Sequence, residues 1–190
     1  MIRATLLGLA LSAGPLFAQD VMMEDGGPGY PPKMGEISGF LGKEAVAWET
    51  FDFSIGAFDA SAWVNEYNGV VTLRLMGYPP GQPQIDTGRV LISADMGKAL
   101  KKRGKSSEVE IEIYRDEDRD GPRLSNKGKG GRLKITRLKL APGAASGYGE
   151  IEGVVTARLC PVDWKEQRCQ DFSASFTTDL QFDGDRKSVV

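Results

Sequence analysis

Apolar and polar residues alternate along most of the chain after residue 35, which is the period of half-buried β-strands. In the clearest case Val109, Ile111 and Ile113 alternate with glutamates. Nine segments show such a pattern: 35–41, 44–53, 60–67, 70–77, 85–95, 107–115, 131–140, 147–159 and 170–180. The pattern predicts a single antiparallel β-sandwich of about nine strands over residues 35–182, or alternatively a closed β-barrel with room for a ligand.

Turn residues separate several of these segments. Gly42–Lys43 and Asn68–Gly69 are typical of tight hairpin turns, and the second tolerates positive φ at both positions. Residues 96–103 offer one short helix, with Asp95 as its N-cap and basic residues near its end. The sequence therefore predicts two early hairpins and one helix.

The two cysteines of the chain, Cys160 and Cys169, lie between two alternating segments. We interpret them as a disulfide that closes a β-hairpin, worth roughly 2–3 kcal/mol. If the cysteines are opposite one another, all other opposed residues have numbers that sum to 329. This register pairs Arg158 with Asp171 and places Phe176 over Gly153; it also opposes Glu150 to Asp179, where we expect the ladder to fray.

Segments 107–115 and 131–140 show opposite charges on their polar faces, so we expect them to be neighbours. The apolar phase of the second segment slips by one between Ile135 and Leu138. This slip predicts a β-bulge near Thr136 or Arg137.

The N-terminal residues have the pattern of an export signal. Arg3 precedes an apolar run from Ala4 to Ala13 that is too short to span a bilayer, and Ala18 is a small residue at a cleavage position. We expect a signal peptide over 1–18, a flexible segment over 19–34 and a flexible tail over 183–190. The mature protein is then periplasmic or secreted, where a disulfide persists, and does not span the membrane.

The segment GEISGFLGK at 35–43, followed by Trp48, and the segment GEIEGVVTARL at 149–159 resemble a loose group of small exported bacterial β-sandwich proteins. The similarity covers fewer than thirty residues, and the group has no assigned activity. The resemblance therefore implies a fold class and transfers no functional residue.

Charge and composition exclude several functions. The chain has 24 basic and 26 acidic residues, a net charge of −2, which argues against general nucleic-acid binding. It has no histidine, so the usual general base, Ser-His triads and histidine metal sites are absent. We expect a monomeric, non-enzymatic protein with no catalytic residue and no firm metal site.

Calcium is the one cofactor candidate. Asp116, Asp118 and Asp120 precede Gly121 with the spacing of the first half of a calcium-binding loop. The residue at the twelfth position is Lys127, where such a loop requires a bidentate glutamate. The segment is therefore either a looser calcium site or an acidic solvated loop.

Basic residues gather in the second half of the chain. They are Arg123, Lys127, Lys129, Arg132, Lys134, Arg137 and Lys139, with Lys98–Lys105 as a further group. They form either a patch for an anionic envelope component or an acidic protein surface, or a solubilising surface that balances nearby acids.

An aromatic residue occupies the loop that the predicted disulfide closes. Trp164 would be either a rigid recognition tip or a ring that folds back over the core. We expect the loops 161–168 and 116–130 to be the principal binding surfaces.

Carboxylates are the remaining candidates for catalysis. Glu49, Asp52, Asp59 and Glu66 lie near Trp48 and Trp63, a combination found in sugar-cleaving enzymes. The sequence thus favours a binding or accessory module; a carrier of an apolar small molecule and a carboxylate hydrolase are the alternatives.

Overall fold

The computed structural model describes residues 31–53, 60–83, 88–115, 123–140, 146–162 and 168–183. In this part of the chain the secondary structure is β-strand and turn, without helix. The strands are β1 (Lys33–Leu41), β2 (Glu44–Phe51), β3 (Ala62–Tyr67), β4 (Val70–Gly77), β5 (Val90–Asp95), β6 (Lys105–Ser106), β7 (Val109–Tyr114), β8 (Arg123–Ser125), β9 (Arg132–Leu140), β10 (Ser146–Pro161) and β11 (Gln170–Asp183).

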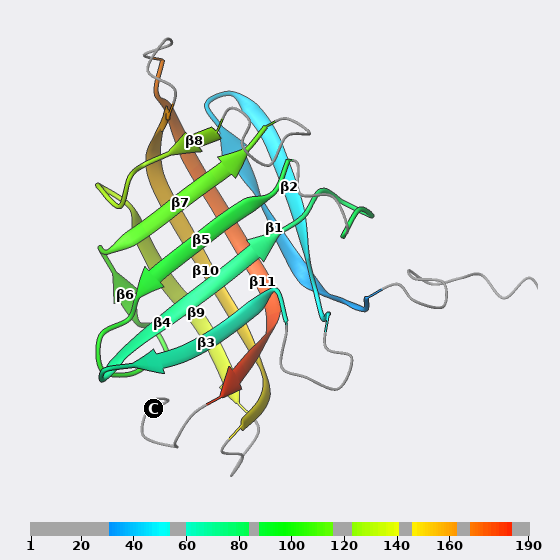
Figure 1. Ribbon diagram of the computed structural model, residues 1–190, viewed down its shortest axis with the longest axis vertical. Coiled ribbons are helices and arrows are strands. Elements are labelled where there is room, and N and C mark those ends of the chain that lie inside the picture. The colour runs from blue at the N-terminus through cyan, green and yellow to red at the C-terminus, as the bar shows by residue number, and fades with distance from the viewer. Residues whose placement is uncertain are drawn as a thin grey trace, which may run out of the picture.

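The strands form the two layers of a sandwich, which cross one another in Figure 1. The eleven strands are hydrogen-bonded into one continuous sheet, which folds into these two layers. The back layer pairs its strands in the order β2-β1-β11-β10-β9-β6. The front layer has the order β3-β4-β5-β7-β8. The layers join where β8 pairs with β10 and where β11 pairs with β3. The β11–β3 contact is short and parallel, whereas the other strand pairings are antiparallel. The predicted all-β sandwich is confirmed.

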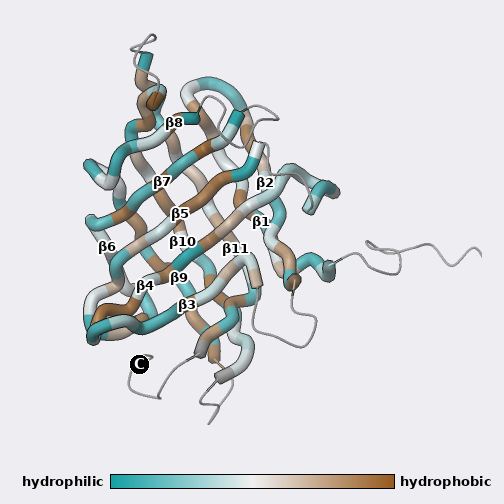
Figure 2. Tube along the Cα trace, in the orientation of Figure 1, coloured by the Kyte–Doolittle hydropathy of each residue, from teal (hydrophilic) through white to brown (hydrophobic). Residues whose placement is uncertain are grey.

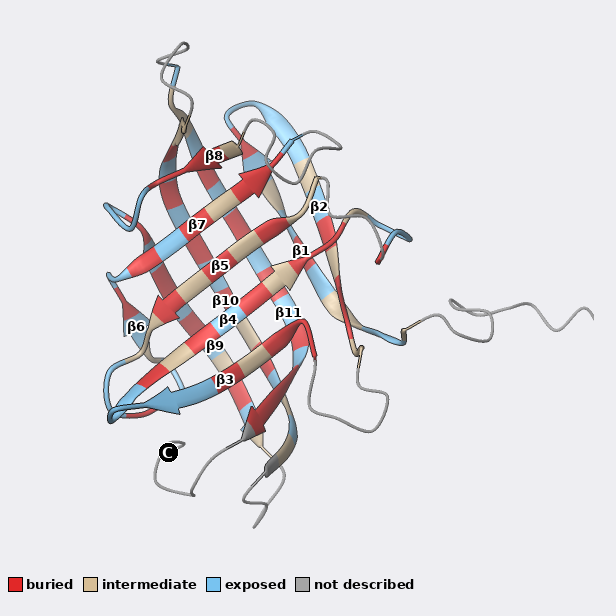
Figure 3. Cartoon of the chain, viewed as in Figure 1, coloured by how far each residue is buried: buried red, intermediate tan, exposed pale blue. Residues whose placement is uncertain are grey.

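The core lies between the layers, and burial alternates along the strands as the sequence pattern predicts (Figures 2 and 3). The back layer contributes Phe172 and Phe176, and the front layer contributes Leu73 and Ile111, all with at most 2% of their surface exposed. Burial of each such side chain contributes about 1.5–3 kcal/mol before the entropy of folding is subtracted.

Trp48 fixes one corner of this core. Its ring packs edge-on against Phe172 with 6.2 Å between ring centres. Its indole N–H donates to the carbonyl oxygen of Gly88 at 2.6 Å, so the polar atom of this buried side chain is satisfied.

Both predicted early hairpins are confirmed. Gly42, between β1 and β2, has φ 61°, and Asn68 and Gly69, between β3 and β4, have φ 52° and 76°. These left-handed conformations match the right-handed twist of the flanking strands.

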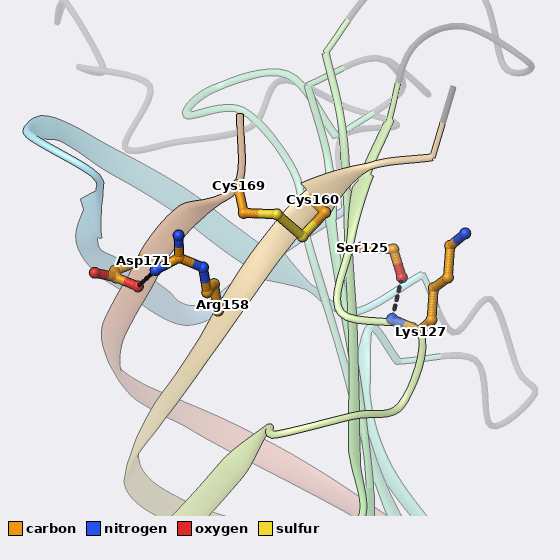
Figure 4. Close-up of a disulfide and its surroundings, with 6 residues drawn as sticks. All are labelled: Ser125, Lys127, Arg158, Cys160, Cys169 and Asp171. Atoms are coloured by element: carbon orange, nitrogen blue, oxygen red, sulfur yellow. Dashed lines mark hydrogen bonds and ion pairs between the residues drawn. A yellow bond between two sulfur atoms is a disulfide. The ribbon is translucent and has the colours of Figure 1, made fainter. Parts of the chain in front are cut away.

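The predicted β10–β11 register is confirmed, with Leu159 opposite Gln170 and Ser146 opposite Asp183. Arg158 and Asp171 form the expected pair at 3.4 Å. A Cβ atom on Gly153 would overlap the Phe176 ring, so the aromatic side chain occupies the space that the glycine leaves. The Cys160–Cys169 disulfide joins the two strands at the end of this ladder (Figure 4).

The expected fraying at Glu150 and Asp179 is wrong, because the ladder continues four residue pairs further. A third strand stabilises this position: Lys139 on β9 lies 2.9 Å from the Glu150 carboxylate. The like-charge contact therefore remains within regular sheet.

The predicted helix over 96–103 is wrong. The Asp95 carboxylate accepts a hydrogen bond from the Gly97 N–H at 2.7 Å, which closes a turn and does not cap a helix. Gly97 and Arg103 both have positive φ, which ends helical geometry on either side. Leu100, fully buried, anchors the segment to the core.

Two short strands were not predicted: β6 and β8. Asn126 extends the pairing of β8 with β7, because its side-chain oxygen accepts from Ile111 N at 2.8 Å and its amide donates to Val109 O at 2.7 Å. The Asn126 side chain thus makes hydrogen bonds to β7 that a neighbouring strand's backbone would otherwise make. The alternation of apolar and polar residues does not predict such a contact.

The expected pairing of segments 107–115 and 131–140 is also wrong. β7 pairs with β5 and β8 in the front layer, whereas β9 pairs with β10 and β6 in the back layer. The predicted bulge is confirmed, because Arg137 faces Glu152 and Ile135 faces Gly153, leaving Thr136 without an opposed residue.

Candidate anion-binding site

The outer face of the back layer carries two continuous rows of opposed residues. Opposed residues point to the same side of a sheet, so each row is a strip of neighbouring side chains. The first row runs Lys105, Lys134, Val154, Ser175, Ser38, Ala47 from β6 to β2. The second runs Arg132, Thr156, Ser173, Phe40, Ala45 from β9 to β2.

A neighbouring part of the same face is electrically neutralised. We call Arg137, Lys139, Glu150 and Glu152 the paired segment. Arg137 Nη1 lies 2.7 Å from Glu152 Oε1 and Lys139 Nζ lies 2.9 Å from Glu150 Oε2. The hydrogen bond and the charge of Lys139, assisted by Arg137, lower the pKa of Glu150.

The cations at the start of β9 have different neighbours. Lys134 lies directly opposite Lys105 on one side and Val154 on the other, and Arg132 lies opposite Thr156. Among the residues that the structure describes, these three cations form no ion pair. Like charges directly opposite one another in a sheet are destabilising, so the β6–β9 contact concentrates uncompensated positive charge.

The nearest acid on β10 does not correct this imbalance. Glu152 lies on the row next to Lys134, at the diagonal position of the ladder. Its carboxylate is already the hydrogen-bond acceptor of Arg137 at 2.7 Å. Lys134 therefore lacks a dedicated partner on either neighbouring strand.

A hollow of about 400 Å³ lies at these cations. We call its lining the basic pocket: Lys105, Ser106, Ser107, Arg132, Leu133, Lys134, Val154 and Thr156. Ammonium and guanidinium groups donate hydrogen bonds without accepting them, and the hydroxyl groups can do both. The pocket thus presents donors and positive charge to an oxygen-rich anion.

A second hollow, of about 640 Å³, continues from the basic pocket along the same face, and Val154 lines both. Its floor carries serine, alanine and glycine residues from β1, β2 and β11. Phe40, with 58% of its surface exposed, is the large side chain in it. This surface combines hydroxyl groups with one accessible aromatic ring.

A third groove, of about 310 Å³, lies on the outer face of the front layer and includes Trp63, Arg74, Glu110 and Glu112. The Arg74 guanidinium lies over the Trp63 ring, 5.9 Å from its centre. Arg123 lies 3.6 Å from Glu112. The charged groups of this groove thus have neighbours that already engage them.

The candidate catalytic acids that the structure describes are engaged separately. Glu49 accepts hydrogen bonds from Lys33 and the Gly81 N–H, both at 2.7 Å. Partial burial opposes ionisation of Glu49, but these bonds outweigh it and lower its pKa. Asp52 accepts from the Tyr148 hydroxyl at 2.7 Å.

Glu66 lies near the β3–β4 turn, opposite Val71, and Asp59 lies outside the described residues. The acids predicted as a group are therefore not brought into one described site.

Several other predicted residues also lie outside the described part of the chain: Asp116, Asp118 and Asp120 of the candidate calcium loop, and Trp164 of the candidate recognition tip. The same holds for the expected signal peptide at 1–18. Within the described ranges, no group of three or more histidine, cysteine, aspartate or glutamate residues is placed to hold a metal ion.

The basic pocket uses only part of the predicted basic group, namely Arg132 and Lys134 with Lys105. The sequence-based prediction did not include Val154 and Thr156, which line the basic pocket, or Phe40, which lines the adjoining hollow. A signal was present: outward positions of 149–159 change from acids at 150 and 152 to Val154 and Thr156. At that change, β10 no longer provides carboxylates to pair with the cations of β9.

Comparisons of the chain with protein-family models, with curated proteins and with solved structures found no match. Over the described ranges, the structure contains no helix that is long and apolar enough to cross a membrane.

Proposed function

We propose that the protein is a non-enzymatic binding module that takes an anionic partner at the basic pocket. The observation that carries this proposal is the direct opposition of Lys105 and Lys134, with Arg132 on the adjacent row and no described ion-pair partner. A bound anion would convert this repulsion into attraction. Binding and stability are then linked, because a ligand that prefers the folded state stabilises it.

The proposed partner is an anionic component of the bacterial envelope, met in the periplasm or outside the cell. The signal-peptide pattern of residues 1–18 supports export. The Cys160–Cys169 bridge supports an oxidising compartment.

Binding is favoured over catalysis and over transport of an apolar ligand. The chain has no histidine, and Glu49 and Asp52 hold hydrogen bonds from neighbouring residues. The Trp and Phe side chains that would line a carrier cavity include Trp48 and Phe172, which pack against one another in the core.

Calorimetric titration with inorganic tripolyphosphate tests the proposal. We expect binding that weakens as salt rises, because exposed charges are screened. The double variant Lys105→Gln/Lys134→Gln should lose most of the affinity. The single variant Lys134→Gln should also lose affinity, and its matched control is Lys139→Gln, which removes one charge from the same strand but at a cation already bound to Glu150. Equal losses in these two single variants would refute the proposal.

A further inference from the structure

We infer that the anionic partner is an acidic polysaccharide, held by its carboxylates at the basic pocket and by its sugar rings along the two outer rows toward Phe40. This inference rests on the proposed function, since it specifies the ligand of the same site. Three features carry it: the charge of the pocket, the hydroxyl groups beside it and the exposed ring beyond.

The positive charge of the basic pocket favours an anionic ligand. Because the surface continues from the basic pocket toward Phe40, it favours an extended ligand. The hollow around Phe40 meets the basic pocket at Val154, so one ligand can lie over both. The first row crosses six strands from β6 to β2, a span of roughly 24 Å at about 4.8 Å per strand spacing. A single small anion would occupy only one end of it.

The chemistry of the rows favours sugar over acyl chain. Ser38, Ser173, Ser175 and Thr156 face outward next to Val154. Hydroxyl groups both donate and accept, as sugar hydroxyls do, whereas covering them with hydrocarbon would leave them unpaired. The Ser175 hydroxyl donates to the Ser38 carbonyl oxygen at 3.4 Å, which leaves its own oxygen lone pairs available to a ligand.

Phe40 supplies the apolar part of the contact. Its ring stands beside Ser173 and Ala45, which are small and leave its face accessible. Flat aromatic surface next to hydroxyl donors suits the apolar face of a sugar ring, which has hydroxyl groups around its edge.

The experiment compares three polymers by calorimetry: polygalacturonate, an acidic polysaccharide; polyglutamate, a polyanion without sugar rings; and dextran, an uncharged polysaccharide. We expect polygalacturonate to bind at least tenfold more tightly than polyglutamate, and dextran to show no measurable heat. Phe40→Ser should weaken polygalacturonate about fivefold and leave tripolyphosphate unchanged. Tyr67→Ser, which removes another exposed aromatic ring from the front layer, is the control and should change neither.

The outcomes separate the two levels of the proposal. If polyglutamate binds as tightly as polygalacturonate and Phe40→Ser has no effect, the polysaccharide inference is overturned while the anion site stands; an acidic protein surface then fits better. Preferential binding to phosphatidylglycerol vesicles would overturn it in favour of a lipid. If neither tripolyphosphate nor any polyanion binds, the proposed function itself fails.

Discussion

The two ends of β9 carry the same kind of side chain in opposite circumstances. Arg137 and Lys139 lie against Glu152 and Glu150, and their charges are used within the fold. Lys134 and Arg132 lie against Val154 and Thr156, and their charges remain open to solvent. The difference comes from the neighbouring strand, so a basic strand by itself does not define a binding surface.

The bulge at Thr136 separates these two ends. Ile135 points into the core before it and Leu138 points into the core after it, so the extra residue resets the alternation. Without it, a strand that buries Ile135 would also turn Arg137 inward. The bulge thus keeps cations outward on both sides while β10 decides which are neutralised.

The largest effect we expect comes from disturbing this boundary. Gly153 faces Ile135 at the bulge, and a methyl group there would meet the Phe176 ring and the Lys134 carbonyl oxygen. Gly153→Ala should therefore lower the free energy of unfolding by about 1–3 kcal/mol, as overpacked cores do. Chemical denaturation measures this, with Val154→Ala, at an exposed neighbour, as the control. Equal stability of Gly153→Ala and wild type would show that the boundary is not packed as described.

A second change converts the open end into a paired one. Val154→Glu places an acid opposite Lys134, as Glu152 is placed opposite Arg137. Tripolyphosphate affinity should fall more than tenfold, which corresponds to at least about 1.4 kcal/mol, while the melting temperature does not decrease. The control is Val154→Gln, of similar size without charge. Retained affinity in Val154→Glu would mean that the anion does not bind at this pocket.

Neutralising one cation at each end should shift stability in opposite directions. Lys134→Gln removes the repulsion from Lys105 and should raise the melting temperature by roughly 1–2 °C, whereas Lys139→Gln removes an ion pair and should lower it by a similar amount. Scanning calorimetry at low salt measures both shifts. They should shrink in 1 M salt, where screening is strong; shifts of the same sign at low salt would contradict the comparison.

The smallest expected effect concerns the like-charge contact between Glu150 of the paired segment and Asp179, which lies opposite it on β11. Burial first, and then the charge of Glu150, raise the pKa of Asp179 above its ordinary value of 3.8. The protonated carboxyl is therefore favoured in the folded state, and its contribution to stability is present below pH 3.8 and is lost as pH rises through the raised pKa. Asp179→Asn should raise the melting temperature by less than about 1 °C at pH 7, and the gain should vanish below pH 3.8. A gain that persists unchanged at pH 3 would contradict this assignment.

Much of the fold follows from local pattern. The β10–β11 register could be derived because the two cysteines fix one opposed pair and the period of two then fixes all others. The bulge at Thr136 was visible as a slip in apolar phase. Both predictions depend on residues close in sequence or tied by a covalent bond.

The errors arose where the choice of neighbour is tertiary. Complementary charge suggested β7 as the partner of β9, but β10 follows β9 directly and carries its own acids, and consecutive strands usually pair. The prediction of a helix over 96–103 was wrong because an aspartate such as Asp95 can accept a backbone hydrogen bond in a turn as well as at a helix N-terminus. The positive φ of Gly97 is compatible with the turn and not with a helix. The basic pocket depends on β6, a two-residue strand too short to leave a pattern.

The most direct test of the central claim is an NMR titration of the isotope-labelled protein with tripolyphosphate. We expect the largest amide shifts at the basic pocket, at Lys105, Arg132, Lys134 and Val154, and small shifts at Arg137 and Lys139. That result would show that the open cations bind the anion and the paired ones do not. Shifts of equal size at both ends of β9, or none at the pocket, would contradict the claim.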